Sequence, residues 1–132
     1  MPKKINKKIL IVEDDEDFSV ILQKKFANEG FSIVTAGNGQ EAIEVTEREK
    51  PDLILSDVLM PKMDGMTMMK KLREANEWGK SVPIILLTNL SADDDKINKA
   101  ITENEPAYYL VKANYTISDL VEKIKERLSR KY

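Results

Sequence analysis

Five residues able to bind a metal ion or a charged substrate each follow a short apolar run of the sequence. Two carboxylates follow the first run, one follows the third, and a threonine and a lysine follow the last two: Glu13, Asp14, Asp57, Thr88 and Lys112. Carboxylates a few ångströms apart repel each other by roughly 1–4 kcal/mol per pair, depending on the local dielectric. They stay ionised only if a cation lies among them, and a set of oxygen ligands selects Mg²⁺ or a similar hard ion.

A carboxylate beside such a cation can attack phosphorus and become an acyl phosphate. Mg²⁺ and Lys112 would neutralise two of the phosphoryl oxygens, and the hydroxyl of Thr88 could bind the third. The sequence contains no His and no Cys. This excludes histidine bases, thiol nucleophiles and metal sites made of thiolate or imidazole. The sequence also lacks a glycine-rich phosphate-binding loop, which excludes ATP binding by a Walker motif.

The acidic run at 13–17 has a second interpretation, because negative charge also stabilises the N-terminus of a helix. We accept that explanation for residues 15–17. Glu13 and Asp14 stand directly at the end of an apolar strand, where acids have no evident structural purpose, and there we favour a metal site. Asp57 taken alone could cap a helix or a loop, but opposite two other acids we favour a functional role.

Length and composition fit one globular domain. The chain has 132 residues, of which 42% are hydrophobic and 33% charged, and a domain usually has roughly 100–200 residues. Lys and Arg number 21 against 23 for Asp and Glu, which gives a net charge of −2. Because there is no basic excess, we expect no binding to nucleic acid.

The N-terminus carries the only dense group of lysines. Residues 1–8 are basic, but the apolar run that follows has only four residues, which is too short for a signal peptide. No run approaches the roughly 18 apolar residues that a membrane span needs, so we expect no membrane association. We therefore expect a cytoplasmic protein whose first eight residues form a solvated tail; a basic contact arm is the alternative.

Apolar runs typical of buried strands alternate with helical patterns along the whole chain. Strands are expected at residues 9–12, 31–36, 53–55, 83–87 and 107–111. Helices are expected over about 18–29, 40–49, 66–77 and 117–128, with a weaker one beginning at the capping residues 91–94. Such alternation implies a parallel sheet covered on both faces, with right-handed crossovers. Ligands bind beyond the carboxyl ends of the strands in such a sheet, where the five residues above lie.

The segment at 57–65, with the sequence DVLMPKMDG, resembles the corresponding segment in the receiver domain of two-component response regulators. The resemblance also rests on ILIVEDD at 9–15, on Thr88 and on YLVK at 109–112. It covers nearly the whole chain, with residues 9–132 as the domain, and the chain is similar to stand-alone regulators of the chemotaxis type. It implies an α/β, flavodoxin-like (βα)5 fold, in which a parallel five-stranded sheet in the order 2-1-3-4-5 lies between two helical layers.

The resemblance assigns a role to each residue that matches the family motif. It implies that Asp57 accepts the phosphoryl group and that Lys112 binds that group. It also implies that Mg²⁺ is held by Glu13, Asp14, Asp57 and the backbone carbonyl of Leu59. The phosphoryl donor would be a histidine kinase or a phosphotransfer protein, which agrees with the absence of His from this chain.

Thr88 and Tyr109 resemble the pair of residues that transmits the signal in this family. Thr88 would move toward the phosphoryl group, and Tyr109 would rotate inward into the space that it leaves. The surface that changes would comprise the helix expected after Ser91, the fifth strand and the last helix. Because the last expected helix ends the sequence, we expect output by contact with another protein.

Three residues depart from the usual family pattern. Ala113 follows the lysine where the family usually has Pro, Asn89 is larger and more polar than the usual residue after the threonine, and Glu13 replaces the commoner Asp. A cis peptide bond costs about 0.5–1 kcal/mol before Pro but roughly 2.5–4 kcal/mol before another residue. We therefore expect a trans bond between Lys112 and Ala113. The longer Glu13 should still reach the metal, and Asn89 should narrow access to the site.

Two other functions stay open at this stage. The first is a Mg²⁺-dependent phosphohydrolase with an aspartyl nucleophile, but that class usually has a second acid two residues later, where this chain has Leu59. The second is a scaffold that binds partners without being phosphorylated, which the complete set of five residues argues against. We favour a phosphorylated switch that is not an enzyme acting on external substrates.

Overall fold

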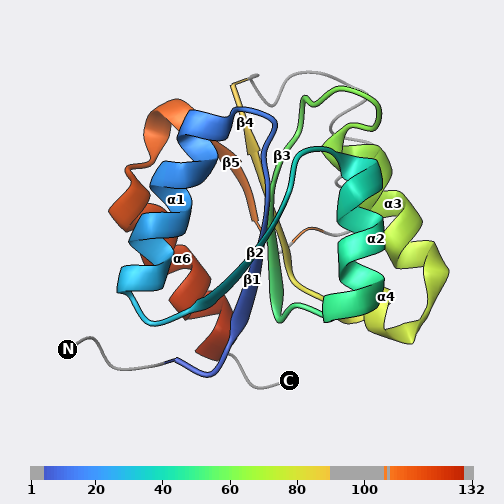
Figure 1. Ribbon diagram of the computed structural model, residues 1–132, viewed down its shortest axis with the longest axis horizontal. Coiled ribbons are helices and arrows are strands. Elements are labelled where there is room, and N and C mark those ends of the chain that lie inside the picture. Colours follow the sequence, from blue (N-terminus) through green and yellow to red (C-terminus); the bar gives the residue numbers. More distant parts are fainter. Residues whose placement is uncertain (1–4, 90–105, 107, 130–132) are drawn as a thin grey trace.

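A computed structural model describes residues 5–89, 106 and 108–129 of the chain (Figure 1). Five strands and five α-helices are described, together with one short 3-10 helix, η1. In chain order they are β1 (Lys8–Val12), α1 (Glu16–Asn28), β2 (Ser32–Ala36), α2 (Gly39–Glu49), β3 (Leu53–Asp57), α3 (Gly65–Ala75), α4 (Glu77–Ser81), β4 (Ile84–Thr88), β5 (Tyr108–Val111), η1 (Lys112–Asn114) and α6 (Ile117–Ser129). The helix expected after Ser91 lies outside the described residues.

The five strands form one parallel sheet in the order β2-β1-β3-β4-β5, which confirms the predicted topology. Two strands extend further than the apolar runs alone indicated. β3 continues to Asp57 and β4 to Thr88, and every residue of both strands is buried. Asp57 and Thr88 therefore occupy the last positions of their strands and do not lie in the loops. The strand backbone fixes the direction of both side chains.

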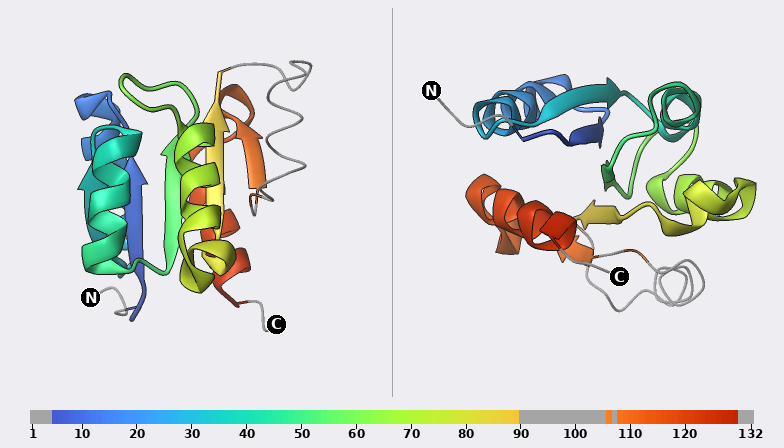
Figure 2. Two further views of the ribbon diagram at one scale, coloured as in Figure 1. Left: turned by 90° about the vertical axis from the view of Figure 1, so that its right-hand side faces the viewer. Right: turned by 90° about the horizontal axis from the view of Figure 1, so that it is seen from below.

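Helices cover both faces of the sheet, with α1 and α6 on one side and α2, α3 and α4 on the other (Figures 1 and 2). Alternate residues of each strand enter one of two apolar clusters. In β1, Ile9 and Ile11 pack with α1 and α6, whereas Leu10 and Val12 pack with α2 and α3. Burial on both faces explains why the strands appear in the sequence as unbroken apolar runs.

Side-chain caps begin the helices that leave the carboxyl edge of the sheet. Asp15, Asn38 and Asp64 each accept a hydrogen bond from a backbone N–H in the first turn of α1, α2 and α3. This confirms that the acids at 15–17 serve the start of a helix. Gly30 follows α1 with a φ of 103°, a conformation that glycine adopts without a Cβ penalty, as expected for a residue that ends a helix.

The predicted helix over 66–77 is wrong at its C-terminal end. Helix α3 ends at Ala75, and the extended Asn76 then caps a separate short helix, α4, which the periodicity did not predict. Gly79 of α4 lies so close to Leu72 that an added Cβ would stand 1.9 Å from its carbonyl oxygen. Arg73 secures the same turn, because its guanidinium donates to the carbonyls of Gly79 and Val82 at 2.7 Å each.

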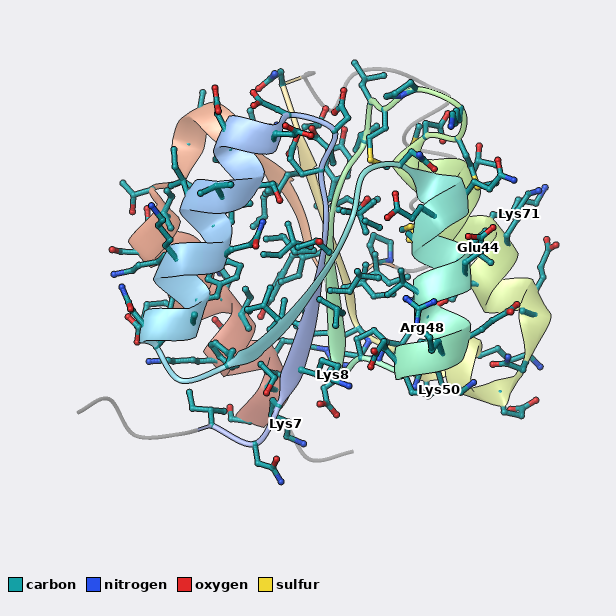
Figure 3. The ribbon with its side chains drawn as sticks, viewed as in Figure 1. Lys7, Lys8, Glu44, Arg48, Lys50 and Lys71 are labelled. Carbon is teal, nitrogen blue, oxygen red and sulfur yellow. The ribbon has the colours of Figure 1, made fainter. Side chains whose placement is uncertain are left out.

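The opposite end of the sheet carries basic side chains that are mixed with acids. Lys7, Lys8 and Lys50 lie at that end (Figure 3), where Lys8 Nζ forms a 2.8 Å ion pair with Glu49. Strand β1 begins at Lys8, the residue where we expected the tail to end, and the Ile5 N–H donates to the carbonyl of Gly30. In the described part of the chain, no helix has the length and apolar character that crossing a membrane requires.

Candidate functional site

Three carboxylates meet at the carboxyl edge of the two central strands. Glu13 and Asp14 directly follow β1, and Asp57 ends β3. One oxygen of each carboxylate lies within 4.8 Å of the others, and Glu13 and Asp57 are buried whereas Asp14 is exposed. This is a compact set of hard oxygen donors with one side open to water, and it fits a divalent cation such as Mg²⁺ that keeps several water ligands.

Backbone contacts hold these carboxylates in place. The N–H of Glu13 donates to the carbonyl of Ala36 at 3.0 Å, and one carboxylate oxygen of Glu13 accepts from the N–H of Asp15 at 3.1 Å. Behind Asp57, the N–H of Gly65 donates to the carbonyl of Val58 at 2.8 Å. An added Cβ on Gly65 would lie 2.1 Å from the carbonyl oxygen of Asp57, so only glycine allows the start of α3 to pack there.

Lys112 brings a positive charge to the same edge from the end of β5. Its Nζ lies 2.9 and 3.0 Å from the two carboxylate oxygens of Asp57 and 3.6 Å from Glu13 Oε2. No peptide bond in the described residues is cis, so the bond to Ala113 is trans, as predicted. The lysine instead leads into η1, a short turn closed by a 3.2 Å hydrogen bond from the N–H of Tyr115 to the carbonyl of Lys112.

The charges of the site are unbalanced. Burial, the hydrogen bond with Asp57 and the negative charge of Asp57 together raise the pKa of Glu13 to about 7, against the opposing effects of the Asp15 amide and Lys112. Burial lowers the pKa of Lys112, but the hydrogen bonds and charges of Asp57 and Glu13 outweigh that effect and raise it overall. One ammonium thus faces three carboxylates, and the excess negative charge favours a bound cation.

Thr88 and Tyr109 lie on neighbouring strands beside this edge. Thr88 ends β4 and is 1% exposed, and in the register of β4 with β5 it lies opposite Val111. Tyr109 packs against the cluster under α2 and α3, and its buried hydroxyl has no hydrogen-bond partner among the described residues. Tyr108 faces the other way, where its hydroxyl donates to Glu126 at 2.8 Å. The two tyrosines therefore point to opposite faces of the sheet, as adjacent residues of a strand do.

Two of the remaining site residues lie on the rim. Leu59 is 59% exposed in the loop after β3, and Asn89 is exposed directly after Thr88. That the carbonyl of Leu59 binds a metal stays a prediction. The methionines around α3 fill the core, since Met68 and Met69 are fully buried and Met60, Met63 and Met66 pack against the same cluster.

Sequence analysis missed one neighbour of the site, Phe18 of α1. The Lys112 Nζ lies 4.9 Å from the centroid of the Phe18 ring. Both residues border a cavity of about 250 Å³ beside the carboxylates. In the sequence, Phe18 is simply one member of the apolar stripe of α1, and nothing there indicates a contact with a lysine 94 positions later.

Comparison with known proteins decides the family. A sequence profile of the response regulator receiver domain matches residues 9–125. The chain belongs to this family. It is 41% identical over 93 residues to the alkaline phosphatase synthesis transcriptional regulatory protein PhoP of Bacillus subtilis, a match that covers 70% of this chain and 38% of PhoP. A probable transcriptional regulator, ycf27 of Porphyridium aerugineum, is 37% identical over 90 residues, a match that covers 68% of this chain and 36% of ycf27.

Solved structures of receiver domains share the whole fold. A response regulator from Chloroflexus aurantiacus is 30% identical, with a TM-score of 0.81 over 96% of this chain and 100% of its own. The receiver domain of a sensor histidine kinase from Pseudomonas aeruginosa, solved with magnesium in its active-site cleft, is 25% identical, with a TM-score of 0.82 over 96% of this chain and 100% of its own. The receiver domain thus spans less than two fifths of PhoP and ycf27, whereas it matches these solved chains in full.

Proposed function

We propose that this receiver domain acts as a switch in which Asp57 accepts a phosphoryl group from a histidine kinase or a phosphotransfer protein. The observation that carries the proposal is the position of the Asp57 carboxylate, which lies 2.9 Å from Lys112 and within 4.8 Å of oxygens of Glu13 and Asp14. In the transfer, an Asp57 oxygen forms a bond to phosphorus while the bond from phosphorus to the donor imidazole nitrogen breaks. The electron pair of that bond leaves with the imidazole.

Several residues of the site would together neutralise the negative charge of the phosphoryl group. Glu13, Asp14, Asp57 and the backbone carbonyl of Leu59 would hold Mg²⁺, which supplies Lewis-acid stabilisation of the phosphoryl oxygens when it is bound. The Lys112 ammonium would move from the Asp57 carboxylate to a second phosphoryl oxygen. Magnesium in the cleft of the related Pseudomonas receiver domain supports this choice of metal.

We propose that the signal leaves the site through Thr88 and Tyr109. Thr88 would donate its hydroxyl to the remaining phosphoryl oxygen, and Tyr109 would repack against the space that it leaves. The Tyr109 side chain packs against the cluster under α2 and α3, on the strand next to the one that ends at Thr88, and this placement supports the route. β5 and α6, with the segment between β4 and β5, would present the change to a downstream protein.

In this proposal the protein is a switch and not an enzyme that acts on external substrates. We also propose that it works in the cytoplasm, as expected from the sequence. A hydrolase is less favoured, because the exposed Leu59 stands where that class usually has a second acid. No contact with nucleic acid or membrane is part of the proposal.

Incubation with acetyl phosphate and Mg²⁺, followed by intact-protein mass spectrometry, tests the proposal. The wild type should gain one phosphoryl group, and chelation of Mg²⁺ or the Lys112→Met change should greatly slow the gain. Asp57→Asn should remove it. A scaffold would gain no phosphoryl group under any condition, and a hydrolase would turn over many acyl phosphates without accumulating a phosphoprotein.

A further inference from the structure

We propose that Phe18 is a positioning residue for Lys112, and this inference rests on the proposed function. The Lys112 ammonium has two kinds of neighbour. Asp57 and Glu13 lie 2.9–3.6 Å from it, and the centroid of the Phe18 ring lies 4.9 Å from Nζ. That distance is within the roughly 6 Å over which the face of an aromatic ring attracts a cation.

The lysine needs such a support because the chain around it does little to restrain it. Lys112 begins the short η1, which a single backbone hydrogen bond at 3.2 Å closes, and its neighbours Ala113 and Asn114 are exposed. The side chain also borders the cavity of about 250 Å³, into which a flexible ammonium could swing. Asp15 borders the same cavity and offers a competing carboxylate there.

Phe18, by contrast, is firmly placed. Its N–H donates to the Asp15 carboxylate at 3.2 Å, which fixes the first turn of α1. Its side chain packs against the apolar cluster formed by the sheet, α1 and α6. The Phe18 ring therefore lies beside the ammonium where both residues border the cavity, and the N–H of Phe18 already occupies one oxygen of the competing Asp15 carboxylate.

An aromatic face suits a lysine that must move during the reaction. A hydrogen-bond acceptor would hold the ammonium at one point, whereas the attraction to a ring face varies gently with position. The ammonium can thus pass from an Asp57 oxygen to a phosphoryl oxygen while it stays in contact with Phe18. We therefore expect Phe18 to affect how fast Asp57 is phosphorylated more than how tightly the metal binds.

The test compares Phe18→Leu, Phe18→Tyr and the wild type in the full chain. Leucine keeps an apolar side chain but removes the π face, and tyrosine keeps the face. We expect Phe18→Leu to slow phosphorylation by acetyl phosphate by about two- to five-fold, the range that a cation–π contact at an accessible site supports. Mg²⁺ affinity should be unchanged, and Phe18→Tyr should restore the rate.

Two further measurements separate positioning from a general loss of packing. The ε-methylene protons of Lys112 should resonate upfield in the wild type and in Phe18→Tyr because of the ring current, and the shift should vanish in Phe18→Leu. Phe26→Leu removes a fully buried ring from the same helix and should change neither the Lys112 resonance nor the rate of phosphorylation. If Phe18→Leu were phosphorylated at the wild-type rate, or if its Lys112 resonance were unchanged, the role of Phe18 would be refuted and the proposed function would stand. If the wild type also failed to be phosphorylated, the proposed function would be refuted and this inference with it.

Discussion

The raised pKa of Glu13 predicts that neutralising this side chain stabilises the metal-free protein. Burial and the neighbouring Asp57 raise the pKa from 4.5 to about 7. At about 1.4 kcal/mol per pKa unit, holding Glu13 ionised above pH 7 costs the folded state up to roughly 3 kcal/mol. Glutamine keeps the shape, and its oxygen can still accept from the Asp15 N–H. Glu13→Gln should therefore raise the unfolding free energy at pH 8 by about 1–3 kcal/mol once the weak Lys112 contact is discounted.

The sign of the pH dependence follows from which state binds the proton more tightly. The folded protein holds the Glu13 proton more tightly than the unfolded chain does. The stability that this group contributes is thus fully present below about pH 4.5 and is lost as the pH rises toward 7. The advantage of Glu13→Gln should be near zero at pH 4 and reach its full value near pH 8.

Urea denaturation in the presence of a chelator, at pH 4 and at pH 8, measures this difference. The exposed Glu16 in the first turn of α1 provides a matched control, and Glu16→Gln should change stability by no more than about 0.5 kcal/mol at either pH. Saturating Mg²⁺ should reverse the order, because the cation stabilises the carboxylate but not the amide. An equal loss of stability at both pH values would refute the reasoning.

Three further outcomes follow from the geometry of the site. Gly65→Ala should lower the unfolding free energy in urea by about 1–3 kcal/mol, because the new Cβ meets the carbonyl oxygen of Asp57; unchanged stability would contradict that close approach. Asp14→Asn should weaken Mg²⁺ binding in titration calorimetry by about tenfold or more, because it removes an attraction of roughly 1–4 kcal/mol. The exposed control Asp17→Asn should leave the affinity unchanged, and equal effects of the two changes would argue against the metal site. Leu59→Asn should speed the loss of the phosphoryl group, measured by mass spectrometry over time, because the apolar side chain cannot orient an attacking water; an unchanged rate would exclude that role.

The strand order and the site edge could be predicted because they depend on short-range patterns. Unbroken apolar runs such as Leu53–Leu55 must be buried on both faces, and parallel strands bring their carboxyl ends together. The sequence alone therefore predicts that Glu13, Asp57 and Lys112 lie together at one edge of the sheet. Oxygens of the two carboxylates that follow β1 and of the one that ends β3 lie within 4.8 Å of one another, as that argument requires.

Features that depend on tertiary contacts could not be predicted in the same way. No Pro or Gly at Asn76 predicts that the helix breaks there. The break arises because Gly79 packs on Leu72 and Arg73 binds the following turn. The contact between Phe18 and Lys112 joins two residues far apart in sequence. In the sequence, Phe18 has the same spacing as any core residue of an amphipathic helix.

Chemical trapping of the phosphoryl group tests the central claim most directly. After incubation with acetyl phosphate and Mg²⁺, borohydride reduction converts an aspartyl phosphate to homoserine, and peptide mass spectrometry locates the converted residue. Our account predicts homoserine at position 57 and at no other aspartate, with none in Asp57→Asn. Homoserine at Asp14 or at another carboxylate of the wild type, or no conversion at all, would contradict it.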